Sequence, residues 1–252
     1  MSIVAKSPNA QEGGHWYTRD GEPMYTVEST KGLQRATTLR DARKLNLVPS
    51  VTTIINVAAK PALTQWLQKQ VLMAALTLPK IKNETEEQYI ERIIRDSKEQ
   101  GKAAADAGTE IHAAVQAYYE NRSHGHSEHV MGCQQAIENA FGKHEWISER
   151  AFAHDLGFGG KVDMYTDGIV VDIKTKEFTD SDTIGGYDEH MMQLAAYRVG
   201  LGMPNARCAN VFVSRSVPGL AVVKEWPEED LKQGWEMFTH LLSYWQIKNS
   251  HQ

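Results

Sequence analysis

Hydrophobic and polar residues alternate along two neighbouring stretches of this chain, residues 160–166 and 169–174, and an Asp167-Gly168 pair stands between them. An Asp-Gly pair in that position is a strong hairpin signal, because a two-residue type I′ turn needs positive φ at both central residues. The two stretches therefore predict a tight β-hairpin. One face of this hairpin is apolar and can bury against a core, and it carries Val162, Met164, Ile169, Val171 and Ile173.

The other face of the hairpin carries charged residues in an unfavourable arrangement. If the Asp-Gly pair forms the loop, the register sets Asp163 directly across from Asp172, and Lys174 projects from the same face. Cross-strand neighbours have Cβ atoms about 5 Å apart, and like charges at that distance destabilise the pair. A divalent cation offsets such repulsion, so the hairpin predicts a metal site. The alternative is an exposed face with ordinary charges, and a bulge or a longer loop would change the register.

The remaining periodic segments predict helices before and after a small group of strands. Helices are expected at residues 38–46, 51–72, 85–107, 108–121, 133–141, 188–201 and 228–249, and further strands at 146–154, 209–214 and 220–226. Pro61 should kink or divide the second of these helices. A second hairpin is expected from residues 15–18 and 23–27. This order of elements indicates an α/β or α+β domain with a central sheet.

Composition and charge exclude several classes of protein. The chain has 252 residues, 41% hydrophobic and 23% charged, which is typical of a globular protein. Its net charge of −5 gives no support to a uniformly basic nucleic-acid binder, although local basic patches still bind nucleic acid. Two cysteines, Cys133 and Cys208, are too few for an iron–sulfur cluster or a secreted disulfide framework. The N-terminus has no signal-peptide hydrophobic region and no apolar run could span a bilayer, so we expect a soluble cytoplasmic protein.

Two predicted helices carry further candidate residues. His112 follows Gly108 by one helical turn and points inward, and the glycine permits close approach of another backbone or a ligand. Gln193 and Tyr197 share one helix face at i and i+4. Gln193 could orient an acidic ligand or touch a phosphate, and Tyr197 could hydrogen-bond or stack on a base. The alternatives are a satisfied core histidine and an ordinary helix-packing face.

Polar and aromatic residues nearer the N-terminus are candidates for holding a substrate. Ser50 and Thr52 stand at a helix start, where hydroxyl and backbone N–H groups can contact a phosphate. The alternative is that Ser50 only caps the helix. Trp16, Tyr17 and Trp66 could stack on the bases of a single strand, although buried aromatic residues are commoner.

Four short motifs follow one another along the chain: a helical histidine at His112, Gly-x-x-Asp ending at Asp163, Asp-x-Lys at Asp172 and Lys174, and Gln-x-x-x-Tyr at Gln193 and Tyr197. In this combination the chain resembles the PD-(D/E)XK nuclease superfamily, specifically its RecB-like exonuclease branch. The segment 49–54 also resembles the entry region of phage-encoded members and of the mitochondrial genome-maintenance exonuclease. The resemblance runs from Pro49 to Tyr197, and its motifs are specific only when taken together.

The resemblance implies a central mixed β-sheet flanked by helices, with a restriction-endonuclease-like core and a helical N-terminal region. It implies hydrolysis of phosphodiesters with Mg²⁺ or Mn²⁺, which the hard oxygen ligands of the hairpin also favour over Zn²⁺. Asp163, Asp172 and the carbonyl of Ile173 would bind the metal, and His112 would hold it from the helix side. Lys174 would orient or deprotonate the attacking water.

The same resemblance assigns roles to three further residues. Gln193 and Tyr197 would support the site or contact DNA, and Glu149 matches an acidic position that is often seen in this branch. Several relatives carry a four-cysteine iron–sulfur cluster, which this chain cannot bind. We expect a single nuclease domain over residues 1–252, made of an N-terminal hairpin and short helix (1–48), the core (49–226) and a C-terminal helix (227–252).

The expected function is therefore that of a metal-dependent DNA nuclease. The resemblance favours an exonuclease on single-stranded or frayed DNA ends, with DNA and replication or recombination proteins as partners. It also favours the cytoplasm of a bacterial or phage-infected cell. One alternative is a non-catalytic module of the same fold that binds DNA ends or a partner protein. The other is a hydrolase of small phosphodiesters.

Overall fold

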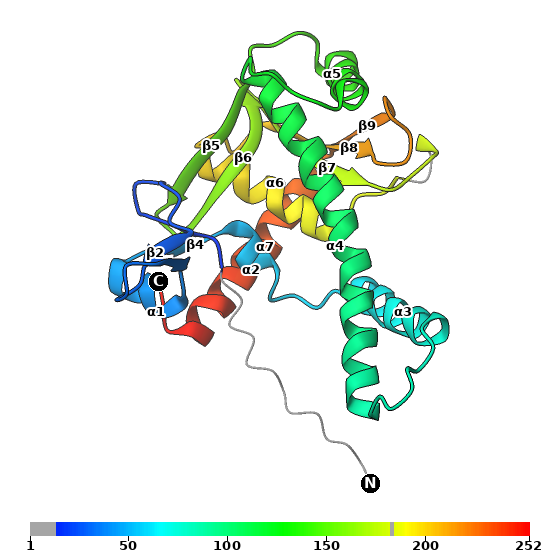
Figure 1. Cartoon of the computed structure of the whole chain (residues 1–252). Coiled ribbons are helices and arrows are strands. Elements are labelled where there is room, and N and C mark those ends of the chain that lie inside the picture. The colour runs from blue at the N-terminus through cyan, green and yellow to red at the C-terminus, as the bar shows by residue number, and fades with distance from the viewer. Residues whose placement is uncertain (1–13, 182–183) are drawn as a thin grey trace.

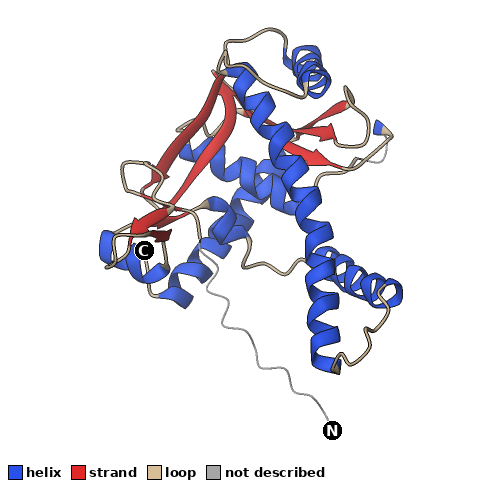
Figure 2. Ribbon diagram, in the orientation of Figure 1, coloured by secondary structure: helices blue, strands red, loops and turns tan. Residues whose placement is uncertain are grey.

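A five-stranded mixed sheet forms the centre of the protein in a computed structural model that describes residues 14–181 and 184–252 (Figures 1 and 2). Residues 1–13 of the expected N-terminal segment lie outside the described residues. The strands follow chain order in the sheet: β5 (Ile147–His154), β6 (Phe158–Thr166), β7 (Ile169–Lys176), β8 (Arg207–Ser214) and β9 (Ala221–Trp226). Only β7 and β8 are parallel, and a helix connects them, as a parallel crossover requires.

Helices cover both faces of this sheet. They are α1 (Leu39–Leu45), α2 (Val51–Ile55), α3 (Pro61–Thr77), α4 (Glu86–Tyr119), α5 (Ser127–Phe141), α6 (Asp188–Gly200) and α7 (Glu228–Asn249). Apolar side chains of α4 and α5 form one core cluster with the sheet, and those of α2, α6 and α7 form a second. The predicted α/β class, with a mixed sheet flanked by helices, is confirmed.

The predicted boundary between two helices at Gly108 is wrong, because α4 continues through this position for 34 residues. One glycine costs a helix interior only about 1 kcal/mol, and the packing of α4 against α3, α5 and β7 offsets that cost. The predicted division at Pro61 is confirmed, since this proline is the first residue of α3, where its missing N–H is not needed. In Figure 1, α3 and the first half of α4 project together away from the sheet.

The second predicted hairpin, from residues 15–18 and 23–27, has different strand partners in the structure. The short strand β1 (Trp16–Tyr17) pairs with β4 (Val48–Pro49), and β2 (Thr26–Glu28) pairs with β3 (Gln34–Ala36). A single bridge between Tyr17 and Pro23 remains of the predicted pairing. Two backbone hydrogen bonds flank this bridge, from Thr18 N–H to the Glu22 carbonyl at 2.9 Å and from Met24 N–H to the Trp16 carbonyl at 2.8 Å, so the innermost part of the predicted hairpin is formed.

Within the described parts of the chain, no helix combines the length and the apolar character that crossing a membrane requires.

Candidate active site

The hairpin predicted around the Asp-Gly turn is present, and its register is confirmed over three pairs that end at Met164 and Val171. The next predicted pair, Asp163 directly opposite Asp172, is not formed. Instead, Asp163 Oδ2 accepts a hydrogen bond from the backbone N–H of Ile173 at 2.8 Å. A carboxylate oxygen thus replaces a backbone acceptor at this point of β7.

An irregularity in β5 and β6 accompanies the early end of this ladder. Glu149 has a φ of 57°, in the left-handed region, and neither Glu149 nor Asp163 is paired between these strands, although the pairs on both sides are formed. Met164 packs in the α4–α5 cluster and Val162 in the α6–α7 cluster, so β6 rotates between them. The prediction that Val162 shares the apolar face of Met164 is therefore wrong. A non-glycine residue in the left-handed region costs about 1 kcal/mol, and such residues concentrate at functional sites.

His112 of α4 lies against Asp163, with 3.1 Å between Nε2 and Oδ2. The hydrogen bond to Asp163 raises the pKa of His112 above its ordinary value, although burial opposes it. Burial alone would raise the pKa of Asp163, but the hydrogen bond and charge of His112, together with the charge of Lys174, lower it. The predicted inward position of His112 is confirmed, and the imidazole and the carboxylate form an ion pair when His112 is protonated.

Asp172 is 1% exposed and is held by two side chains. Lys174 Nζ donates to its Oδ1 at 2.8 Å, and Asn210 Nδ2 donates to its Oδ2 at 2.8 Å. Trp226 Nε1 in turn donates to Asn210 Oδ1 at 2.7 Å. Asp172, Asn210 and Trp226 thus form a buried chain of hydrogen bonds across three strands, β7, β8 and β9.

Burial raises the pKa of Asp172, and the negative charge of Asp163 raises it further, against the opposite effect of Lys174. Burial lowers the pKa of Lys174, but the charges of Asp172 and Asp163 outweigh this and raise it. Lys174 is therefore a cation near neutral pH. Asp163 therefore lies close enough for its charge to raise the pKa of Asp172, although the backbones of the two residues are not paired.

Gln193 and Tyr197 lie on α6, which packs against β6, β7 and β8. Gln193 Nε2 donates to Tyr197 Oη at 2.9 Å, and Tyr197 is 5% exposed. Burial raises the pKa of Tyr197, and the charges of Asp172 and Asp163 add to this effect. The predicted alternative that these two residues contact DNA is wrong for this structure, because both side chains are buried.

Glu149 lies at the edge of the site and forms an ion pair with Lys161 of β6. Its negative charge raises the pKa of His112, although this effect is smaller than that of Asp163. Burial lowers the pKa of Lys161, but the hydrogen bond and charge of Glu149 outweigh it and raise the pKa, and the charge of Asp163 adds to this effect. Lys161 is thus a second lysine beside the carboxylates, and the sequence motifs did not reveal it.

Ser50 and Thr52 begin α2, close to the start of β6. Ser50 Oγ accepts from the backbone N–H of Thr53 at 3.0 Å, and the side chain is buried, so its hydroxyl caps the helix. The proposed contact of Ser50 with a phosphate is wrong for this arrangement. Thr52 is half-buried and lines a pocket together with Arg40 and Lys248, so its hydroxyl remains within reach of a ligand.

The close approach predicted at Gly108 is confirmed. A Cβ atom at this position would overlap Thr175 Oγ1, so the absence of a side chain lets α4 lie directly on β7. An open pocket of about 440 Å³ begins here, and it is lined by Gly108, His112, Lys174, Thr175 and Arg215. Solvent and ligands therefore reach His112 and Lys174 from this side.

The donor set around Asp163 and Asp172 fits a hard divalent cation. Over residues 14–181 and 184–252, no three His, Cys, Asp or Glu side chains are already grouped to hold a metal ion. An ionised carboxylate has about four lone-pair positions, so both aspartates can still accept further bonds. Mg²⁺ is commonly held by one or two carboxylates, with water and substrate phosphate oxygens as its other ligands. Asp163, Asp172 and the carbonyl of Ile173 would supply oxygen ligands of this kind.

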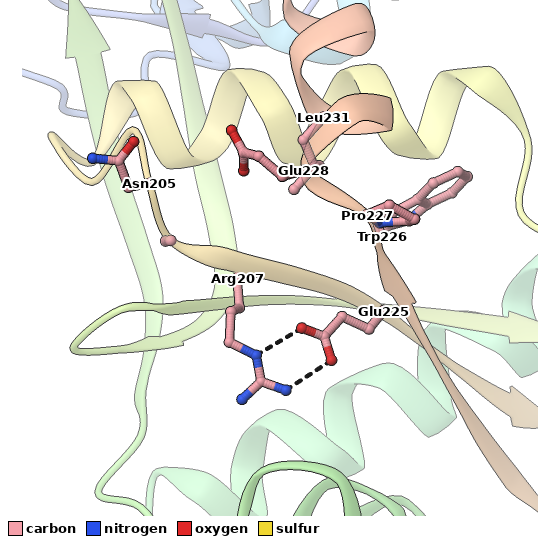
Figure 3. Close-up of a pocket in the computed structure, with 8 residues that line it drawn as sticks. Asn205, Arg207, Glu225, Trp226, Pro227, Glu228 and Leu231 are labelled. Carbon is pink, nitrogen blue, oxygen red and sulfur yellow. Dashed lines mark hydrogen bonds and ion pairs between the residues drawn. The ribbon is translucent and has the colours of Figure 1, made fainter.

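A separate pocket lies where β8 begins and β9 ends (Figure 3). Arg207 and Glu225 face each other there with two hydrogen bonds of 2.6 and 2.7 Å. Glu228, on the other side of the same pocket, pairs with Arg198 at 2.7 Å. None of the predicted site residues, all of which the structure describes, lines this pocket.

Comparison with known proteins adds little to this description. No protein-family model matches the chain, and no curated protein matches it. A solved structure titled "Crystal structure of SSO0001" aligns with 71% of this chain and 85% of its own, at 18% sequence identity and a TM-score of 0.28. A likeness this distant carries no argument about the site or its function.

Proposed function

We propose that this protein is a Mg²⁺- or Mn²⁺-dependent deoxyribonuclease that hydrolyses phosphodiester bonds. One observation carries the proposal: two carboxylates, Asp163 and Asp172, stand on adjacent strands, with His112 at 3.1 Å from the first and Lys174 at 2.7 Å from the second. Repelling carboxylates beside a lysine suit chemistry on an anionic substrate, because a bound cation and the lysine together balance the charge of the phosphodiester.

The cation would be held by Asp163, Asp172 and the Ile173 carbonyl. His112 would bind the same cation from the side of α4. When bound, the cation would neutralise phosphate charge and make hydroxide available near neutral pH. In the reaction, the oxygen of a water molecule bonds to phosphorus while the P–O bond to the leaving nucleotide breaks. The proton lost by the water is balanced by one that the leaving oxygen takes up.

Lys174 would orient the attacking water or hold a phosphate oxygen. Its ammonium group lies 2.8 Å from Asp172 and lines the open pocket. Its raised pKa, for which the charges of Asp172 and Asp163 outweigh burial, favours orientation over proton removal. Gln193 and Tyr197 would fix the position of the carboxylates, and Glu149 with Lys161 would support the same edge of the sheet.

The sequence resemblance further supports an exonuclease that acts on single-stranded or frayed DNA ends during replication or recombination. The proposed setting of the protein is the cytoplasm of a bacterial or phage-infected cell. Replication or recombination proteins are the proposed partners.

The test uses linear single-stranded DNA labelled at either end, incubated with Mg²⁺, with Mn²⁺ or with chelator. Products that shorten from one end only with metal are expected, and Asp172→Asn and Lys174→Met should abolish them. Asp167→Asn is a matched control, since it removes an exposed carboxylate from the same hairpin while asparagine suits the turn. Cleavage that continues in chelator, or that Asp172→Asn leaves unchanged, would reject the proposal.

A second candidate is a non-catalytic module that binds DNA ends. The ion pairs of His112 with Asp163 and of Lys174 with Asp172 favour it, because they balance the carboxylates without a cation. This candidate predicts DNA binding in chelator with no cleavage in either metal. Turnover of a small chromogenic phosphodiester, without cleavage of DNA, would instead indicate a small-molecule hydrolase.

A further inference from the structure

A pocket of about 720 Å³ lies between the start of α3 and the start of α6. Its floor is apolar, with Ile55, Met192 and Met237. Its rim carries two aromatic residues, Trp66 and Tyr187, and three charged ones, Lys60, Asp188 and Glu189. Trp66 is 44% exposed and Tyr187 is 51% exposed. Large aromatic side chains on a pocket rim lose little conformational entropy when a flat ligand stacks on them.

Charged residues connect this pocket to the candidate active site. Lys60 Nζ lies 3.5 Å from Glu189 of α6. Lys176, two residues after Lys174 on β7, lies 3.2 Å from the hydroxyl of Tyr187 on the rim. Charged side chains therefore lead from the carboxylates to the pocket, and a ligand extending along this end of β7 would reach the carboxylates from the pocket.

Further lysines gather at the same end of α6. Lys176 Nζ lies 4.9 Å from the centre of the Tyr187 ring and 3.2 Å from its hydroxyl, and Lys224 Nζ lies 4.4 Å from the centre of the Trp226 ring. Among residues 14–181 and 184–252, no carboxylate forms an ion pair with Lys176 or Lys224. Their positive charges are therefore available to an anionic ligand.

Exposed aromatic rings beside uncompensated lysines favour single-stranded nucleic acid. The lysines attract phosphates, and the aromatic rings stack on bases, with each stacked base contributing about 1–3 kcal/mol. Bases within a duplex already stack on their neighbours, so a side pocket accepts only an unpaired base. An apolar protein segment would fill the floor but would not use the lysines.

We propose that this pocket binds an unpaired base of single-stranded DNA, held by Trp66 and Tyr187, while Lys176 and Lys224 contact the adjacent phosphates. The proposal rests on the function proposed above, since it names the substrate form that the carboxylate site would receive. The pocket lies beside that site, so the strand it holds would continue towards Asp172.

The test measures binding by the full-length protein in chelator, so that no cleavage occurs. The probes are a fluorescent single-stranded oligonucleotide, a duplex of equal length, and the same single strand with abasic positions, which keeps the phosphates and removes the bases. The wild-type protein should bind the intact single strand most tightly. Trp66→Ala and Tyr187→Ala should each weaken this binding about 5- to 100-fold and should leave binding of the abasic strand nearly unchanged.

Tyr244→Ala is the matched control. Tyr244 on α7 is 53% exposed, and the ammonium group of Lys248 lies over its ring, as that of Lys176 lies over the ring of Tyr187. Tyr244 is not part of the pocket. Its removal should not change binding. Trp66→Phe retains an aromatic ring and should recover most of the affinity, which separates stacking from an effect on folding.

The two proposals fail in different ways. Equal affinity for intact and abasic strands, or unchanged affinity in both Trp66→Ala and Tyr187→Ala, would overturn the base pocket even if the protein cleaves DNA. Binding that depends on Trp66 and Tyr187, in a protein that cleaves nothing with either metal, would confirm the pocket and overturn the nuclease.

Discussion

Asn210 donates a hydrogen bond from Nδ2 to Oδ2 of Asp172 at 2.8 Å, across the parallel pair of strands β7 and β8. The two residues are direct partners in the register of these strands, and both are buried. The position of the Asp172 carboxylate therefore depends on a neutral side chain 38 residues further along the chain.

Replacing Asn210 should disturb both stability and metal binding. Asn210→Ala removes a donor to Asp172 and leaves Trp226 Nε1 without its acceptor, which should lower the free energy of unfolding by about 2–3 kcal/mol. Urea denaturation and calorimetric titration with Mn²⁺ would measure the two effects. Trp226→Phe leaves Asn210 Oδ1 without its donor and should also lower the free energy of unfolding, but it should preserve Mn²⁺ affinity, because the hydrogen bond to Asp172 remains. Unchanged Mn²⁺ affinity in Asn210→Ala would contradict the positioning role.

Replacing Glu149 with glycine would separate the role of its carboxylate from that of its left-handed backbone conformation. Glu149→Gly relieves a left-handed conformation but adds freedom to the unfolded chain, so the free energy of unfolding should change by no more than about 1 kcal/mol. DNA cleavage should fall at least severalfold, because the carboxylate that pairs with Lys161 is lost. Asn121→Gly is the control, since Asn121 has a similar φ of 55° beyond the end of α4. Full activity in Glu149→Gly would show that the carboxylate is not needed.

Gly108 should be required for the contact between α4 and β7. Gly108→Ala favours the helix by about 1 kcal/mol, yet its Cβ would overlap Thr175 Oγ1 and displace α4 from the strand. Because α4 carries His112, cleavage should decrease about tenfold or more, as displacements of about 1 Å commonly do. The double variant Gly108→Ala/Thr175→Ala removes the overlapping atom and should recover activity. A double variant no better than the single one would count against this explanation.

His190 should make the protein less stable in acid. Burial, together with the charges of Lys174, Lys176, Lys60 and Lys224, lowers the pKa of His190 to about 4. The unfolded chain, with a histidine pKa of about 6.5, binds more protons between these values. Stability should therefore be retained above pH 6.5 and be lost as the pH falls towards 4, by an amount on the order of 2 kcal/mol.

The variant His190→Gln should remove this part of the acid sensitivity. Thermal unfolding between pH 7 and pH 4.5 would show a smaller fall in midpoint than in the wild-type protein. His240→Gln, on the exposed side of α7, should keep the full fall. Equal pH dependence in His190→Gln and the wild-type protein would exclude His190 as the cause.

The parts of the site that are local in sequence could be predicted from it. The Asp-Gly turn determined the hairpin register, and the two-residue spacing of Asp172 and Lys174 put both side chains on one face. The helices at residues 188–201 and 228–249 were also found to within one residue, because periodicity and clear end signals coincide there.

Features that depend on distant packing could not be predicted. The rotation of β6 between Val162 and Met164 follows from the unpaired position of Glu149 in the neighbouring strand, and no local pattern indicates it. Asn210 and Trp226 were missed because their register with β7 is set by a crossover through α6. An asparagine within the apolar run of β8 was the available signal, since a buried amide needs hydrogen-bond partners.

The bonds across β7, β8 and β9 also determine when the site can exist during synthesis. The ribosome adds His112 and Asp172 well before Asn210 and Trp226, and domains fold as units once their parts have emerged. A growing chain that ends before β9 lacks Trp226, so the chain of hydrogen bonds that holds Asp172 is incomplete. The site can therefore reach its final geometry only after β9 has been synthesised, and chains released from the ribosome before that point carry it incomplete.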